Sequence, residues 1–249
     1  MFSFDRQKQI IEILEKDQSL SVTEMSKRLF ASASTIRRDL NELEKQGILQ
    51  RVHGGAVLLS GTNYDPPAAF RKYHNLAEKQ RIADLAERFL SPSSAYFFDS
   101  SSTATVLATR LEKYPNVRIV TNGIEIPSIL QSSEKLSVIS CGGSLRSPWG
   151  EFTGGITIKT IEEMNADVFF FSCGGFSLEC GATEFREDNV EVKMAFLRRS
   201  KLHILLCDSS KFDTLLFYNS IPLDQIDYIV TDQRPPEAYI GKIRGKLIY

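Results

Sequence analysis

The chain has 249 residues, a formal net charge of −1 and 42% hydrophobic residues, which suits a globular protein with one large domain or two unequal domains. Its apolar runs, such as Ile204-Leu205-Leu206-Cys207, are far shorter than the roughly 20 residues of a bilayer-spanning helix. The charged, amphipathic N-terminus lacks the apolar stretch of a signal peptide, so we predict a cytoplasmic protein with no membrane partner.

Two amphipathic helices are predicted at the N-terminal end. Apolar residues between Ile10 and Leu14 repeat at helical spacing and predict a helix over about residues 4–16. Ser21 and Glu24 have the spacing of a capping box, in which a hydroxyl and a carboxylate satisfy backbone N–H groups at a helix start. A second short helix therefore begins after Ser21.

A third helix follows a tight turn, with Ser32 as its cap and Gly47 at its end. Ile36, Leu40 and Leu43 form a narrow apolar stripe along it. The rest of its surface carries side chains that suit a DNA groove: Ser34, Thr35, Arg37, Arg38, Asn41 and Lys45. Arg can bind guanine, Asn can bind adenine, and hydroxyls can hold phosphates. Such a face also fits an ordinary solvated surface, but two short helices joined by a tight turn favour a helix-turn-helix.

Residues 48–57 alternate around Gly54-Gly55, which predicts a small hairpin behind the recognition helix. Such a hairpin is a wing, and it would bring Arg51 and His53 to the DNA backbone; a plain turn role fits His53 equally well. Residues 1–58, the predicted DNA-binding domain, hold nine Lys or Arg and eight Asp or Glu, a charge of only +1. Few phosphates can then be neutralised per chain, so we expect a homo-oligomer to bind double-stranded DNA.

Residues 59–76 are the predicted linker, because Ser60-Gly61-Thr62-Asn63-Tyr64-Asp65-Pro66-Pro67 is rich in turn formers. Apolar strands alternate with amphipathic helices through the second domain, residues 77–249. The predicted strands are 95–98, 117–120, 136–139, 167–171, 202–207 and 228–230. This alternation predicts an α/β fold with a mostly parallel, Rossmann-like sheet.

Five consecutive strands end in small polar residues. The five segments are Asp99 to Thr103, Thr121 to Gly123, Ser140 to Gly143, Ser172 to Gly175, and Asp208 to Lys211. Ligands bind outside the carboxyl ends of strands in such sheets, and hydroxyls with free backbone N–H groups suit a phosphate. The alternative is a set of small-residue turns without a ligand.

The four cysteines (Cys141, Cys173, Cys180 and Cys207) and three histidines form no metal-binding pattern. The wide spacing favours reduced, buried thiols, so we predict no metal and no cofactor.

Thr35-Ile36-Arg37-Arg38-Asp39-Leu40, followed by Arg51-Val52-His53-Gly54-Gly55-Ala56, resembles the signature of DeoR-type bacterial transcriptional repressors. The second domain resembles the effector domain of this family, which is related to ribose-5-phosphate isomerase. The resemblance implies a phosphorylated sugar or related metabolite as effector. It implies effector contacts at Asp99, Ser101, Ser102, Thr103, Thr121, Asn122, Gly142, Gly143, Lys193, Asp208 and Lys211. Ser101 stands where the family usually has Gly.

Three functions follow from these patterns. The first is a transcriptional regulator, a repressor of a sugar-metabolism operon that a phosphorylated sugar releases from its operator. The second is a sugar-phosphate isomerase-like enzyme with a DNA-binding appendage. We do not favour it, because the acidic segment Thr183 to Asp188 differs from the Asp-Gly-Ala-Asp-Glu-type loop of the related isomerases. The third is a DNA-binding module whose larger domain only assembles oligomers.

Overall fold

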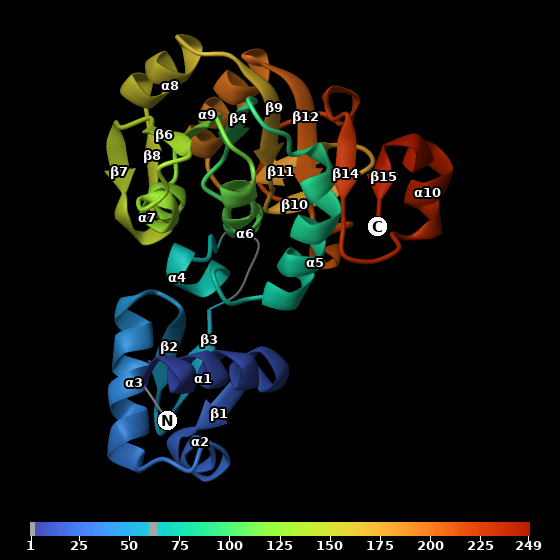
Figure 1. Ribbon diagram of the computed structural model, residues 1–249. Helices are drawn as coiled ribbons and strands as arrows, with labels where there is room; N and C mark the ends of the chain where they lie inside the picture. The colour runs from blue at the N-terminus through green and yellow to red at the C-terminus, as the bar shows by residue number, and fades with distance from the viewer. Residues whose placement is uncertain (1–2, 60–63) are drawn as a thin grey trace. The chain divides into compact units, whose positions relative to one another are not determined.

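The computed structural model describes residues 3–59 and 64–249 and divides the chain into two compact units. The first unit is Met1–His74 and the second is Asn75–Tyr249 (Figure 1). The division falls inside the stretch 59–76 that the sequence suggests as a linker, of which residues 60–63 lie outside the described residues.

The first unit combines helices with a small antiparallel sheet. Its helices are α1 (Ser3–Asp17), α2 (Val22–Arg28), α3 (Ala33–Lys45) and α4 (Ala68–Arg71). Its strands β1 (Ser19–Ser21), β2 (Leu49–Val52) and β3 (Gly55–Leu58) pair in the order β1-β3-β2. The sequence does not reveal β1, because three residues are too few to show an alternating pattern. The helices, the turn and the hairpin together form the winged helix-turn-helix that the sequence predicts.

Both predicted helix caps are formed. Ser21 Oγ accepts a hydrogen bond from the backbone N–H of Glu24 at 3.1 Å, and Ser32 Oγ accepts from that of Thr35 at 3.2 Å. These side chains satisfy N–H groups that have no partner within the helix. The caps therefore fix where α2 and α3 begin.

The apolar stripe of α3 packs into the core of the first unit. Ile36 and Leu40 are fully buried, with Met25 of α2 and Leu14 of α1 in the same cluster. Phe70 of α4 joins this core, which explains why the chain as far as His74 groups with the first unit.

A buried ion pair joins the first and third helices. Arg6 Nε lies 2.5 Å from Asp39 Oδ2 and Arg6 Nη2 lies 3.2 Å from Oδ1, with both side chains buried. The bidentate geometry fixes the orientation of α1 on the back of α3. Asp39 thus has a structural role inside a motif whose neighbouring arginines point outward.

The second unit contains a fully parallel seven-stranded sheet in the order β15-β14-β12-β9-β4-β5-β6. Its strands are β4 (Ala95–Phe98), β5 (Val117–Thr121), β6 (Leu136–Ser140), β9 (Ala166–Phe171), β12 (Ser200–Leu206), β14 (Tyr228–Val230) and β15 (Leu247–Ile248). The predicted fold class, an N-terminal helix-turn-helix followed by a mostly parallel α/β domain, is confirmed.

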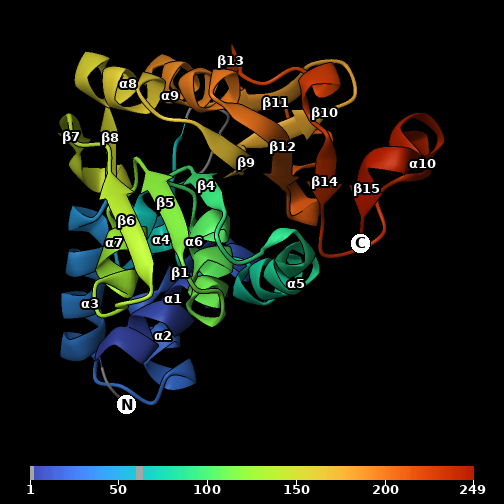
Figure 2. The same ribbon diagram turned by 45° about the horizontal axis from the view of Figure 1, so that its top comes forward.

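Helices cover both faces of this sheet (Figure 2). They are α5 (Leu76–Ala86), α6 (Ser102–Ala108), α7 (Glu125–Leu130), α8 (Gly155–Glu162), α9 (Glu187–Arg198) and α10 (Glu237–Ile243). Alternate residues of one strand serve opposite faces. Tyr96 and Phe98 pack with α5, α6 and α7, whereas Phe97 packs with α8 and α9. Because each face of the sheet packs into its own hydrophobic core, the strands are continuous apolar runs in the sequence.

Several short elements lie outside the sequence prediction. They are the pair β7 (Ser144–Arg146) and β8 (Glu151–Thr153), and the sheet of β10 (Gly175–Ser177), β11 (Gly181–Glu184) and β13 (Tyr218–Asn219). The 3-10 turns are Glu87–Phe89, Thr109–Lys113, Ser147–Trp149, Ser209–Lys211, Leu223–Gln225 and Arg244–Lys246. The last 16 residues, which the sequence left unassigned, contain α10 and β15. None of the described helices is long and apolar enough to cross a membrane.

Candidate functional site

The outward face of α3 carries the predicted recognition residues. Ser34, Arg37, Arg38, Asn41 and Lys45 are exposed, and Thr35 in the first turn is partly buried. Within residues 3–59 and 64–249, Arg37, Arg38 and Lys45 make no side-chain hydrogen bond or ion pair. The face therefore presents three uncommitted cations beside small hydroxyls, which suits a polyanion.

Arg51, one of the two predicted DNA-contacting residues of the wing, ties the wing to α3. The guanidinium of Arg51 donates to Asn41 Oδ1, and the Arg51 backbone N–H donates to Glu44 Oε1 at 2.8 Å. At the hairpin tip Gly54 has φ +79°, a conformation that favours glycine, and His53 beside it is exposed. Arg51 and Asn41 are thus paired with each other, and either must exchange this bond to contact a base.

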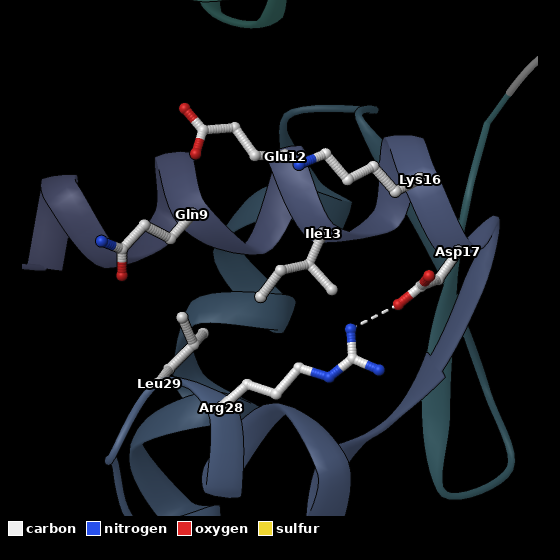
Figure 3. A pocket seen from close by; sticks show the side chains of 7 residues that line it. All are labelled: Gln9, Glu12, Ile13, Lys16, Asp17, Arg28 and Leu29. Atoms are coloured by element: carbon white, nitrogen blue, oxygen red, sulfur yellow. Dashed lines mark hydrogen bonds and ion pairs between the residues drawn. The ribbon is translucent and has the colours of Figure 1, made fainter.

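A separate hollow in the first unit lies between α1 and α2 (Figure 3). Its lining residues are Gln9, Glu12, Ile13, Lys16, Asp17, Arg28 and Leu29. Arg28 spans it by pairing with Asp17 at 2.5 Å and with Glu24 at 3.2 Å. None of the predicted DNA-contacting residues lines this hollow, and its charges largely neutralise one another.

In the second unit the polar segments after β4, β5, β6, β9 and β12 all lie at one edge of the sheet. This follows from the parallel pairing, because strands that run in the same direction end at the same edge. Asp99 follows β4, Asn122 follows β5, Gly142 follows β6 and Asp208 follows β12. The predicted effector residues from distant parts of the chain are therefore brought together at this edge.

Asp99 is fully occupied by bonds within this edge. Its Oδ1 accepts from the backbone N–H and the hydroxyl of Ser101 at 3.0 and 2.5 Å. Its Oδ2 accepts from the Ser172 N–H at 3.0 Å and lies 3.2 Å from Lys193 Nζ. Ser101 also caps α6, since its Oγ accepts from the Ala104 N–H at 3.2 Å. Asp99 and Ser101 therefore shape the loop between β4 and α6.

Lys193 of α9 is buried with 4% of its surface exposed, and its ammonium group donates to Glu184 and to the Ser172 carbonyl. Burial disfavours the charge, but the carboxylates of Glu184 and Asp99 outweigh it and raise the pKa of Lys193 above its ordinary value. The lysine thus pairs with these two carboxylates and links the ends of β4, β9 and β11.

The β5 end presents an acceptor without a partner. Asn122 is 3% exposed; its Nδ2 donates to the Phe152 carbonyl at 3.1 Å, which fixes the amide, and its Oδ1 has no hydrogen-bond partner among the described residues. A buried unpaired acceptor is costly. Thr121 is engaged locally, because its hydroxyl accepts from the Gly123 N–H at 3.0 Å.

The two glycines after β6 are required by the local geometry. Gly142 and Gly143 have φ of +65° and +112°, and a Cβ on Gly143 would lie 2.2 Å from Thr157 Oγ1. That hydroxyl donates to the Gly142 carbonyl at 2.6 Å and ties the turn to α8. The Gly-Gly pair therefore allows a close approach of the chain to this helix.

Asp208 and Lys211 form the end of β12. Asp208 Oδ1 accepts from the Ser210 N–H at 3.2 Å, and from Asn75 Nδ2, also at 3.2 Å. Burial acts to raise the pKa of Asp208, but the positive charge of Lys211 and the Ser210 hydroxyl lower it overall. Lys211 is partly exposed and makes no side-chain hydrogen bond or ion pair in the described part of the chain.

A second ionic cluster beside this edge is absent from the sequence prediction. Buried Glu151 of β8 accepts from Ser100 Oγ at 2.5 Å and pairs with Arg186, which also pairs with Asp188 at 3.1 Å. The Arg186 guanidinium lies 4.0 Å from the centre of the Trp149 ring. Arg186 and Glu151 are 35 residues apart, and no local pattern signals their pairing.

Replacing Lys193 tests the buried charge network. Lys193→Met leaves Asp99 and Glu184 buried without their cation, so we expect the free energy of unfolding to fall by about 3–5 kcal/mol in urea denaturation. Lys201→Met is the control, because the exposed Lys201–Asp167 pair at 2.9 Å should contribute less than about 1 kcal/mol. Equal small losses in the two variants would contradict the structural role of Lys193.

Both halves of the chain match known families. Residues 6–62 match the model of the DeoR-like helix-turn-helix domain, and residues 74–233 match that of the DeoR C terminal sensor domain. The chain is 32% identical to the HTH-type transcriptional regulator GolR of Listeria innocua, over 98% of this chain and 96% of that protein. It is 33% identical to the glycerol-3-phosphate regulon repressor of Escherichia coli, over 91% and 90% of the two chains.

A third relative is the L-fucose operon activator of Escherichia coli, 32% identical over 92% of this chain and 95% of that protein. Among solved structures, ribose 5 phosphate isomerase A from Neisseria gonorrhoeae matches with a TM-score of 0.39 and 13% identity, over 55% of this chain and 53% of that chain. The two family matches and the near full-length relatives show that this chain belongs to the DeoR family of transcriptional regulators.

Proposed function

We propose that this chain represses a sugar-metabolism operon and that a phosphorylated sugar or related metabolite releases it from its operator. The observation that carries the proposal is the pairing of an uncommitted basic helix face in one unit with a convergent polar edge in the other. The names of the relatives support regulation of carbohydrate or glycerol-phosphate genes. One relative is named an activator, so repression rather than activation is part of the proposal.

DNA contact is assigned to α3 and the wing. Arg37 and Arg38 supply base or phosphate contacts, with Ser34, Thr35 and Lys45 beside them, while Arg51, Asn41 and His53 contribute from the wing side. Since the basic charge of one copy is modest, the operator-bound species is a homo-oligomer, which sedimentation of the protein with and without DNA tests.

Effector contact is assigned to the side chains that keep unused hydrogen-bonding capacity at the sheet edge. Lys211 supplies a cation for a phosphate, and Asn122 Oδ1 supplies an acceptor for a sugar hydroxyl. The hydroxyls of Ser102 and Thr103, which make no hydrogen bond with any other described residue, complete the contacts. Asp99, Ser101, Thr121, Gly142, Gly143, Lys193 and Asp208 position them.

The junction between the units supplies a route for the response. Asn75 directly follows His74, and its side chain donates to Asp208 at 3.2 Å and to Ser210 at 3.3 Å. His74 is bonded within the first unit, to Glu15 of α1 at 2.5 Å. A ligand that moves the Asp208 to Lys211 segment therefore changes what Asn75 binds, one peptide bond from the DNA-binding unit.

We propose no catalytic role for the acidic side chains of this edge. Asp99 already accepts backbone N–H groups, and Glu184 is paired with Lys193, so neither is placed as a free base. Aldose–ketose interconversion assays with pentose and hexose phosphates test this point, and robust turnover would favour the isomerase-like alternative. If no sugar phosphate raises the melting temperature, the second domain serves oligomer assembly instead; a ligand at 100 times its Kd would contribute about 2.7 kcal/mol.

Arg37→Ala and Arg38→Ala should each weaken binding to the duplex that the wild type enriches from a random-sequence pool. A base-contacting arginine should lose about 1–3 kcal/mol and relax the preference at one base pair. A phosphate-contacting arginine should lose affinity on all sequences and flatten the salt dependence. Arg198→Ala, which removes an exposed pair with Glu162, is the control and should bind as the wild type does. Unchanged affinity in both α3 variants would remove this helix from the interface.

Lys211→Ala should leave operator affinity near that of the wild type and abolish release by the sugar phosphate that shifts wild-type melting. In cells, a repressor with this change keeps its operon silent when the sugar is supplied, which a reporter fusion measures. Lys242→Ala, an exposed lysine of α10, serves as the control and should respond normally. Normal release of the Lys211 variant would place the effector elsewhere.

Asn75→Ala should separate the two activities. Because it removes the bonds to Asp208 and Ser210, we expect both ligands to bind within about twofold of wild type while effector no longer weakens DNA binding, a loss of the roughly 1–3 kcal/mol coupling typical of allostery. Asn116→Ala changes another asparagine with positive φ (60°) and should retain coupling. Titrations of DNA with and without saturating effector give the coupling directly, and an unchanged value in the Asn75 variant would exclude this route.

A further inference from the structure

The short turn between α2 and α3 (Figure 1) contains Phe30, whose aromatic side chain is almost fully exposed. Phe30 is 97% exposed, whereas the other exposed large apolar residue in the described part of the first unit, Val52, is 44% exposed. A phenylalanine in water gains nothing from the hydrophobic effect. The core of the winged helix-turn-helix therefore does not account for this residue.

The backbone at Phe30 is also unfavourable for an aromatic residue. Its φ is +50°, and the N–H of Ala31 donates to the Ser26 carbonyl at 3.1 Å, the six-residue bond of a Schellman motif that ends α2. The residue in the left-handed conformation of this motif is usually glycine, sometimes asparagine, because a bulky side chain is strained there. The side chain of Phe30 thus contributes nothing to folding and its backbone conformation opposes folding, whereas Asn would form the same turn at lower cost.

Phe30 lies next to the surface assigned to DNA. It precedes Ser32, the cap of α3, by two residues, and the exposed Ser34, Arg37 and Arg38 follow on the first turns of that helix. In a helix-turn-helix the N-terminal part of the recognition helix enters the major groove, so the residues just before it reach the rim of the groove. A phenyl ring there can only make apolar contacts, which DNA offers at the deoxyribose rings and the thymine methyl groups.

We propose that Phe30 is a DNA-contacting residue whose ring packs against an apolar part of the duplex, a deoxyribose or a thymine methyl, beside the recognition helix. This inference rests on the proposed function, since it needs α3 to bind DNA. It adds an apolar contact to an interface otherwise assigned to cations, amides and hydroxyls. Such a contact contributes affinity without releasing counterions, because it neutralises no phosphate.

The experiment compares full-length Phe30→Asn with Gln18→Asn. Gln18 directly follows α1, is exposed in the same unit, has φ +61° and is not among the predicted DNA-contacting residues. It therefore controls for the effect of placing Asn at a position with positive φ. Phe30→Asn should melt at or above the wild-type temperature and bind the enriched duplex about tenfold more weakly, with an unchanged salt slope. Gln18→Asn should show no loss of affinity.

Two further duplexes distinguish the apolar groups. If Phe30→Asn loses the same affinity on a scrambled duplex, the ring contacts a deoxyribose. If the loss of affinity is confined to the enriched duplex, and replacing one thymine of that duplex with uracil weakens wild-type binding equally, the ring contacts a thymine methyl group. Wild-type affinity of Phe30→Asn would overturn the inference and leave the proposed function intact. A fall in its melting temperature would also overturn it, since Phe30 would then stabilise the domain itself. If the wild type enriches no sequence from the pool, the proposed function fails first.

Discussion

One buried ammonium group organises the sheet edge on which the second unit depends. Lys193 lies between Asp99 and Glu184 and also reaches the Ser172 carbonyl, so it joins residues at the ends of three different strands. Two carboxylates at this depth require a cation, and the cation requires them, because each alone would be buried without compensation. The loops at the ends of β4 and β9 are therefore held in one arrangement, and this arrangement fixes the positions of the small polar residues around them.

This constraint divides the polar residues of the edge into two groups. Asp99, Ser101 and Thr121 accept hydrogen bonds from nearby residues, mostly from backbone N–H groups, and these bonds give the loops their shape. Lys211 and Asn122 Oδ1 keep theirs uncommitted among the described residues. A rigid frame that carries a few unsatisfied groups is the arrangement expected of a preorganised binding site, since a ligand then supplies the missing partners without reordering the protein.

The sequence predicted most of what depends on local pattern. The stripe of Ile36, Leu40 and Leu43 identified the buried side of α3, and the alternation of strands and helices identified the parallel sheet and the edge where its polar residues meet. It could not reveal pairs that depend on distant chain segments, such as Arg6 with Asp39 or Arg186 with Glu151, because no periodicity links them. The short strands β10, β11 and β13 were missed for a related reason: they are held by partners elsewhere in the fold and carry too few residues for a pattern.

Residues that break local folding rules are informative about function. Phe30 places an aromatic ring in water on a strained backbone, and Asn122 buries an acceptor without a donor. Ser21 and Ser32 cap α2 and α3, so the two helices that flank Phe30 do not need its exposed ring for their stability. Departures of this kind are expected where folding and binding make different demands. Phe30 lies beside the surface proposed to bind DNA, and Asn122 lies at the sheet edge proposed to bind the effector. Binding at each surface would account for a cost that folding alone does not explain.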